Sequence, residues 1–172
     1  MTTIRPMTVQ DLTRFNNVNL DQWTETYNMN FYLHYLVKWP ECCVTAENAD
    51  GTIAGYMIGK VEGQGEQWHG HVTALSVAPE FRRTGLAKKL MEYLEVVSEQ
   101  THDCYFVDLF VRVTNTAAIT FYQSLGYVVY RIVTGYYSGE EDAYDMRKAL
   151  SRDRDQKSIA DPGKRVDPSE YR

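Results

Sequence analysis

The segment 75–87 constrains the fold of this chain more than any other stretch, because it predicts a strand, a basic loop and a helix in direct succession. Gly85 and the small Ala87 would let the backbone approach a ligand closely. The first amides of a helix have no partner inside it and bind anions. Arg82 and Arg83 add forked cationic donors for the same group. The segment therefore predicts a phosphate-binding loop.

The alternative is a solvated surface, since the pattern R-x-x-G-x-A is short and weak on its own. The strand before it and the amphipathic helix after it favour phosphate binding. The loop is not of the Walker type, because the G-K-[ST] ending is absent. It is not a dinucleotide fingerprint either, because G-x-G-x-x-G is absent.

The remaining periodicity predicts an α+β protein with one mixed central sheet flanked by helices. The capping signal Thr8-Val-Gln-Asp11 should begin the first helix. Glycine, proline and periodicity place the helices near 12–20, 30–39, 86–99 and 115–125, and the strands near 42–46, 52–60, 69–77, 104–113, 127–137 and 143–150. We expect the last strand at the sheet edge. Residues 1–151 should form the domain, and 152–172 a polar tail that is flexible or draped over the surface.

Composition excludes several classes of protein. The chain has 172 residues, enough for one domain, and its net charge of −5 argues against nucleic acid binding as its main task. No apolar run is long enough to cross a bilayer, and the N-terminus lacks the apolar core of a signal peptide. We therefore expect a cytoplasmic protein. Three cysteines without a C-x-x-C pair predict small buried side chains and neither a disulfide framework nor a zinc site.

A second motif, Asn115 to Tyr127, lies downstream of the phosphate loop. Together the two motifs resemble the acetyl-CoA-binding segments of GNAT acetyltransferases, [RQ]-x-x-G-x-[GA] and N-x-x-A-x-x-[FL]-Y-x-x-x-G-[FY]. The resemblance implies the GNAT fold and acetyl-CoA as co-substrate. It implies that the cofactor is bound by backbone and side chains of Leu75, Ser76, Val77, Arg82, Arg83, Thr84, Gly85, Leu86, Ala87, Asn115 and Tyr122.

Longer stretches resemble the catalytic subunits of N-terminal acetyltransferase B (NatB): 15–17, 20–21, 24–27, 68–83, 107–113 and 142–152. This resemblance implies acetylation of nascent proteins that begin Met-Asp, Met-Glu, Met-Asn or Met-Gln. It also implies a large helical-repeat auxiliary subunit that aids ribosome association. The alternatives are a GNAT enzyme for lysine or a small amine, and a non-catalytic acyl-CoA-binding subunit. Intact Tyr122, Arg82 and Gly85 argue against the non-catalytic alternative.

Tyr122 is the candidate general acid, because a phenol can protonate the leaving thiolate and the resemblance places a general acid there. It lies seven residues after Asn115, on the same helix face. The alternative for Tyr122 is a ring packed in the core, and for Asn115 a helix cap. A backbone amide of the strand Leu75–Val77 is the expected oxyanion donor.

The peptide side rests mostly on the resemblance. It implies that Glu25 and Tyr27 border the substrate groove, where Glu25 could bind the α-ammonium or help remove its proton; an ordinary exposed carboxylate is the alternative. His71 and Thr73 share one strand face and could hydrogen-bond a polar side chain. His69 and His71 lack an evident third ligand, so we predict no metal.

Two further sets of aromatic residues each have two alternative roles. Tyr136 and Tyr137 either line the other wall of the groove or pack at a strand end. The aromatic side chains of the first two helical segments form either a docking surface for the auxiliary subunit or part of the core: Trp23, Phe31, Tyr32 and Tyr35.

Overall fold

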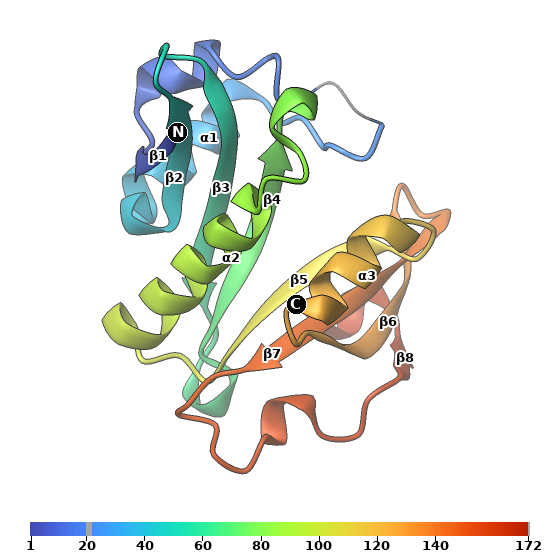
Figure 1. Cartoon of the computed structure of the whole chain (residues 1–172). Coiled ribbons are helices and arrows are strands. Elements are labelled where there is room, and N and C mark those ends of the chain that lie inside the picture. Colours follow the sequence, from blue (N-terminus) through green and yellow to red (C-terminus); the bar gives the residue numbers. More distant parts are fainter. Residues whose placement is uncertain (20–21, 172) are drawn as a thin grey trace.

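The computed structural model describes residues 1–19 and 22–171, and one eight-stranded sheet organises them (Figure 1). The strand order is β1-β2-β3-β4-β5-β7-β6-β8. Pairing is parallel between β4 and β5 and between β6 and β8, and antiparallel elsewhere. This confirms the predicted mixed sheet. The strands are β1 (Thr2–Pro6), β2 (Cys43–Asn48), β3 (Ile53–Glu62), β4 (His69–Val77), β5 (Phe106–Arg112), β6 (Val128–Tyr137), β7 (Glu141–Ala149) and β8 (Lys164–Val166).

Among the described residues, three α-helices cover the sheet: α1 (Met29–Lys38), α2 (Leu86–Val96) and α3 (Thr116–Ser124). The predicted apolar stripe of α2 is confirmed, since Leu86, Leu90 and Leu94 are buried in the larger of two core clusters. The second cluster gathers under α1 and includes Tyr32 and Tyr35. Both rings therefore belong to the core, which excludes them as a freely exposed docking surface.

The parting of β4 and β5 positions the functional site. The two strands pair only from His69 to Val72 on β4, and their ends then diverge (Figure 1). The register with β3 shifts at this point, because Ile58 pairs with Ala74 and Gly59 with Val72. Thr73 is thus an extra residue, a bulge that bends β4 away from its neighbour. The bend opens a space between two strands that are otherwise adjacent.

The first helix was predicted near 12–20, after the capping signal Thr8-Val-Gln-Asp11, and this is wrong. The structure has a 3₁₀ helix at Val9–Thr13, followed by turns; residues 20 and 21 lie outside the described residues. The capping interaction itself is present, because the Thr8 amide donates to the Asp11 carboxylate at 2.8 Å. Beyond these turns the segment is held to β3, because Asn17 donates its side-chain amide to the carbonyl of Ile53 at 3.0 Å.

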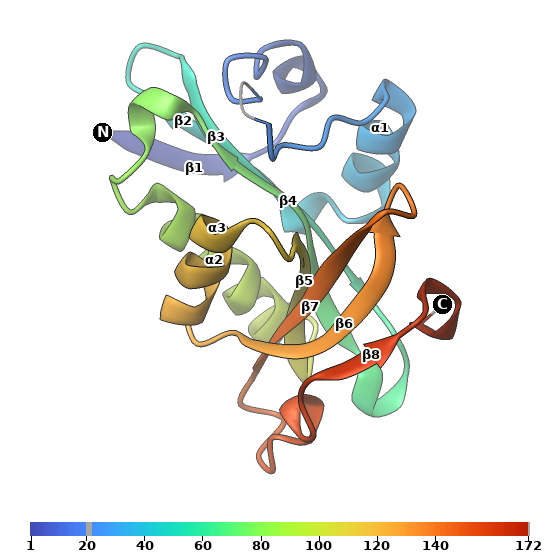
Figure 2. The ribbon, with the colours of Figure 1, turned by 90° about the vertical axis from the view of Figure 1, so that its right-hand side faces the viewer.

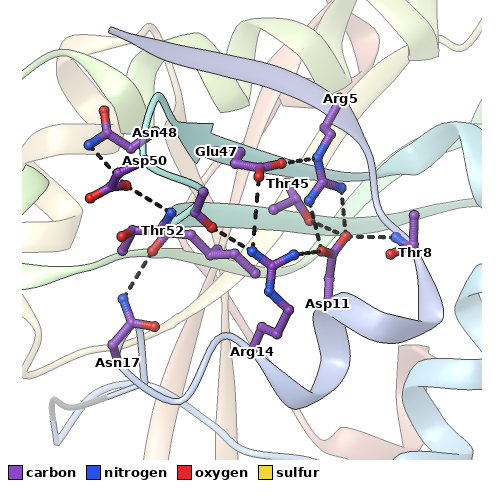
Figure 3. A network of polar contacts seen from close by, with 12 residues as sticks. Arg5, Thr8, Asp11, Arg14, Asn17, Thr45, Glu47, Asn48, Asp50 and Thr52 are labelled. Carbon is purple, nitrogen blue, oxygen red and sulfur yellow. Dashed lines mark hydrogen bonds and ion pairs between the residues drawn. The ribbon is translucent and has the colours of Figure 1, made fainter.

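A network of polar contacts holds this N-terminal segment to the sheet (Figure 3). Arg5 on β1 donates to both oxygens of the buried Asp11 carboxylate at 2.7 and 2.8 Å, and to Glu47 on β2 at 2.5 Å. Burial raises the pKa of Asp11, but the Arg5 guanidinium and the Thr8 bonds outweigh it and lower the pKa to about 2. Strand β1 was not predicted, because the polar run T-T-I-R-P lacks a clear alternation.

The prediction that the last strand lies at the sheet edge is also wrong. Strand β7 lies between β5 and β6, where its Asp145 and Arg147 are buried. Arg131 donates to the Asp145 carboxylate at 2.7 Å, and Arg147 stacks on the Tyr130 ring at 3.8 Å. Charged residues in a strand suggest an edge, but here ion pairs and aromatic faces offset part of the cost of burial. Asp145 Oδ1 and Arg147 Nε are buried without a hydrogen-bond partner among the described residues.

The segment after residue 151 lies along the molecule in Figure 2, where β8 extends the sheet beside β6. The Asp153 carboxylate accepts the amides of Lys157 and Ser158 at 3.0 and 2.9 Å, and Arg147 donates to the Ser158 carbonyl. The division into a domain and a tail stays a prediction. All three cysteines are free and buried. Within the described residues, no helix has the length and apolar character needed to cross a membrane.

Candidate active site

A cavity of about 600 Å³ opens where β4 and β5 part. Helices α2 and α3 border it on one side, and the segment before α1 and the end of β6 on the other. It brings together most of the residues predicted from the sequence: Glu25, Tyr27, His71, Thr73, Leu75, Ser76, Val77, Arg82, Ala87, Asn115, Tyr122, Tyr136 and Tyr137. The predicted residues outside its lining are Arg83, Thr84, Gly85 and Leu86.

The phosphate loop has the predicted strand–loop–helix form. Gly85 is the N-cap of α2 and has φ +80°, a left-handed conformation that favours glycine. A Cβ built on it would meet nothing within 4 Å, so the space above this residue is open. The Thr84 hydroxyl donates to the Phe81 carbonyl at 2.6 Å and closes the turn. The Leu86 side chain is buried in the core, which leaves its backbone amide as the group available to a ligand.

Asn115 and Tyr122 line the same side of the cavity from α3. The Asn115 side chain accepts the Ala118 amide at 3.2 Å, so the capping role is confirmed, and it does not prevent a contact with a ligand. Burial alone raises the pKa of Tyr122 to about 12. The phenol therefore keeps its proton at neutral pH, as a general acid must.

The side of the cavity predicted to bind the peptide begins with two polar pairs, each with one member on β4. His71 Nδ1 lies 2.6 Å from a carboxylate oxygen of Asp108, which is buried on β5. The Thr73 hydroxyl, at the bulge, donates to the Tyr35 hydroxyl at 2.9 Å. In this bond Thr73 uses its hydroxyl proton, so the Tyr35 hydroxyl, which also lines the cavity, keeps its own proton for another acceptor.

An ion-pair bridge joins the segment before α1 to the other wall. Arg112 donates to Glu25 at 2.6 Å and to Glu141 at 2.7 Å, and its guanidinium lies 4.1 Å from the centre of the Tyr137 ring. The Glu25 carboxylate is thus half-exposed but already paired with a cation. Tyr27 stacks on Phe31 with 4.1 Å between ring centres.

Several lining residues were missed from the sequence, namely Tyr35, Lys60, Phe110 and Arg112, together with Asp108 beneath His71. A signal existed for Asp108, because a carboxylate inside an otherwise apolar strand is seldom buried without a partner. Nothing in the sequence indicated which side chain that partner would be.

The donors near His69 and His71 form ion pairs. Glu62 is a third group whose ligand atom lies within 4.8 Å of theirs, and the sequence did not indicate it. Its carboxylate is 2.7 Å from Lys60, however, and His71 Nδ1 is bonded to Asp108. These donors are already engaged with one another, and the absence of a metal stays a prediction.

Comparison with known proteins adds independent findings. Residues 9–127 match the acetyltransferase (GNAT) family model. The chain is 63% identical over 159 residues to N-alpha-acetyltransferase 20 of Dictyostelium discoideum, covering 92% of each chain. It is 56% identical over 170 residues to the N-terminal acetyltransferase B complex catalytic subunit NAA20 of Arabidopsis thaliana, covering 99% of this chain and 98% of that protein.

Solved structures agree. The chain resembles Chaetomium thermophilum Naa20 in complex with a bisubstrate analogue, with a TM-score of 0.92, 44% identity and 97% of each chain covered. It resembles a chain of the NatB acetyltransferase complex bound to a bisubstrate inhibitor, with a TM-score of 0.85, 41% identity and 99% of each chain covered.

Proposed function

Because the chain belongs to the GNAT family of acetyltransferases, we propose that its cleft transfers the acetyl group of acetyl-CoA to the α-amine of protein N-termini beginning Met-Asp, Met-Glu, Met-Asn or Met-Gln. The protein is an acyltransferase with the function of an N-terminal acetyltransferase catalytic subunit, and acetyl-CoA is its co-substrate. The proposal adds the residues that carry out each part of the reaction.

One observation carries the proposal: the cavity between β4 and β5 connects two chemically different sides. The side of α2 and α3 carries the anion-binding loop and Tyr122. The opposite side is aromatic and polar, with Tyr27, Phe31 and His71. An acyl donor and a peptide end that enter from opposite sides would meet at the Thr73 bulge. This geometry brings the reactants into line.

Chain groups supply the chemistry of transfer. The edge of β4 beyond Val72 pairs with no strand on the β5 side among the described residues, so the backbone groups of Leu75–Val77 can bind the thioester arm and stabilise the oxyanion. The attacking amine must be neutral, and a free α-amine has a pKa of about 8. The amine nitrogen forms a bond to the thioester carbon and the carbon–sulfur bond breaks, while the Tyr122 phenol delivers its proton to the sulfur. The nitrogen loses a proton to solvent, and the phenolate regains one from solvent.

Specificity for the second substrate residue is assigned to His71 and Thr73. Asp, Glu, Asn and Gln all carry a side-chain oxygen that accepts a hydrogen bond. An apolar residue would leave buried donors unpaired, at a cost of about 1–3 kcal/mol per group. Tyr27, Tyr136 and Tyr137 would enclose the methionine, and Glu25 would act near the α-amine while held by Arg112.

The setting of the reaction is also proposed. We place the protein in the cytoplasm, bound to a large helical-repeat auxiliary subunit and through it to the ribosome. Relatives named as catalytic subunits of the N-terminal acetyltransferase B complex support a partner subunit. We assign no direct role to nucleic acid or to a membrane.

A peptide screen tests the function. Short peptides varied at positions one and two, each with a free or a blocked N-terminus, would be incubated with acetyl-CoA, with and without cell extract. We expect transfer to free Met-Asp, Met-Glu, Met-Asn and Met-Gln peptides. Transfer to lysine in blocked peptides would favour a lysine acetyltransferase, and cofactor binding without any turnover would favour a non-catalytic subunit.

A further inference from the structure

We propose that Asp108, a buried carboxylate beneath the peptide side of the cleft, is a positioning residue that sets selectivity for the second substrate residue by holding the His71 imidazole as a hydrogen-bond donor. The inference rests on the proposed N-terminal acetylation and deepens it. Asp108 does not line the active-site cavity, and its contact with His71, which does, connects it to the site.

The geometry fixes one nitrogen of the imidazole. His71 and Asp108 are direct neighbours in the parallel register of β4 and β5, and His71 Nδ1 lies 2.6 Å from an Asp108 oxygen. A carboxylate accepts hydrogen bonds, so Nδ1 carries the proton in this pair. The Phe110 ring, with its centre 5.5 Å from that of the imidazole, packs against the same side chain. The proton state of Nε2 therefore decides what His71 can offer to a ligand.

The same pair favours the cation. Burial opposes a charged imidazole, but the Asp108 charge and hydrogen bond outweigh it, so the pKa of His71 lies above its ordinary value. Burial likewise opposes the Asp108 carboxylate, and the His71 charge keeps the pKa of that carboxyl below its usual range. Over a wider pH range than an isolated histidine, His71 presents an N–H donor at both nitrogens.

Other charges surround the pair without replacing Asp108. On β3, Lys60 and Glu62 act on His71 with opposite signs and are paired with each other at 2.7 Å. On β4, His69 Nε2 lies 3.5 Å from the Asp108 carboxylate. Asp108 lines a second cavity, whose other charged groups include Arg131 on β6, Arg147 on β7 and Glu170. Asp145 on β7 is ion-paired with Arg131 and Arg147. From α1 and β6, the Tyr35 and Tyr137 phenols stay neutral because burial raises their pKa.

This arrangement separates acidic from amide substrates. A charged His71 donates to Asp, Glu, Asn and Gln alike, and attracts the carboxylates more strongly. Once His71 loses its proton, Asp108 still holds Nδ1–H, so Nε2 becomes an acceptor. An acceptor repels a carboxylate but receives a hydrogen bond from the amide of Asn or Gln. The preference for Met-Asp over Met-Asn should therefore fall as pH rises through the pKa of His71.

The experiment measures kcat/KM for Met-Asp, Met-Asn and Met-Leu peptides from about pH 6 to 9 in the wild-type protein and in Asp108→Asn. We expect the wild-type ratio of Met-Asp to Met-Asn to fall with pH. In Asp108→Asn, activity on Met-Asp at neutral pH should drop about tenfold, with Met-Leu changed less than about twofold, and the fall of the ratio should move to lower pH.

Two controls separate this role from a structural one. Asp153→Asn removes another buried carboxylate, which bonds Lys157 and Ser158, and should leave the ratios unchanged. In a His71→Gln background, Asp108→Asn should not alter the ratio further. Equal loss on all three peptides with an unmoved pH profile would overturn the proposal. A Met-Asp to Met-Asn ratio that does not change with pH in the wild-type protein would also overturn the proposal. That measurement does not depend on whether any variant folds. Absence of any transfer by the wild-type protein would instead overturn the proposed function.

Discussion

The two sides of the cleft are built in different ways. The side proposed to bind the cofactor comes from two contiguous segments, 75–87 and 115–122, and offers backbone amides and a helix start. The peptide side is assembled from pairs far apart in sequence. His71 and Asp108 are 37 residues apart, and Glu25 and Arg112 are 87 apart.

This difference explains what each side can do. Backbone groups held by a sheet and a helix suit a ligand that is the same in every reaction. Any sequence that preserves the turn also preserves its backbone N–H donors. Side-chain pairs across the sheet can be tuned in charge and shape without altering the fold. The cofactor side is therefore suited to chemistry, and the peptide side to selection. Substitutions on the cofactor side should lower the rate or the affinity for the cofactor. Substitutions on the peptide side should change the preference among substrates.

The largest expected effect is on the chemical step. Tyr122→Phe removes the proposed acid and should lower kcat by about a hundredfold or more, with small changes in either KM. Because the pKa of Tyr122 is about 12, the phenol stays protonated below that pH, so the deficit should be constant from about pH 6 to 9.

A neighbouring tyrosine supplies the control for Tyr122. The Tyr127 hydroxyl is bonded to Glu95 at 3.0 Å and lies outside the lining of the cleft. Tyr127→Phe should keep kcat within about twofold, since one hydrogen bond contributes about 1 kcal/mol to stability and none to the reaction. If Tyr122→Phe behaved like this control, the thiolate would take its proton from water.

The next effect concerns cofactor affinity. Gly85→Val places a branched side chain at φ +80° in the open space above the loop, where the pyrophosphate would lie. We expect acetyl-CoA affinity measured by calorimetry to fall at least about tenfold, because backbone strain and lost close approach act together. Gly65→Val is the matched control: φ there is +58° and its Cβ would also meet nothing within 4 Å. Unchanged affinity in a folded Gly85→Val protein would exclude the loop assignment.

The same contrast explains what the sequence could predict. The loop before α2, the α3 motif and most strands were predicted because each signal is local: a capping residue, a glycine stop or an apolar period. Strand β1 and the central place of β7 were missed because their stability depends on distant partners, such as Arg131 for Asp145. The Thr73 bulge is set by pairing with β3, and no local pattern indicates it.

Selectivity on the peptide side should respond next. His71→Ala removes a hydrogen-bond donor. The ratio of kcat/KM on Met-Asp peptides to kcat/KM on Met-Leu peptides should therefore fall about tenfold, because kcat/KM on Met-Asp decreases. Peptide competition assays at fixed acetyl-CoA measure this ratio directly. Equal loss on both peptides would mean that His71 supports the site or the chemistry and does not read the second residue.

The smallest expected effect lies at the Arg112 bridge. This bridge also gives the strictest test of the division between a cofactor side that reacts and a peptide side that selects. Arg112→Gln removes the cation between Glu25 and Glu141, which should loosen the segment that carries Tyr27. Because the pair is partly exposed and screened by water, the KM for peptide should rise only about two- to fivefold, while kcat and the KM for acetyl-CoA stay unchanged. High salt should produce part of the same change in the wild-type protein and none in the variant.

The exposed pair of Lys157 and Glu66, 3.2 Å apart and outside the cleft, gives the control. Lys157→Gln should leave both KM values unchanged at low and high salt. A lower peptide KM in Arg112→Gln would mean that the bridge restrains Glu25 from binding the α-ammonium. A lower kcat would place Arg112 in the chemistry itself. In that case the division between a cofactor side that reacts and a peptide side that selects would not hold, because a side-chain pair across the sheet would be part of the reaction.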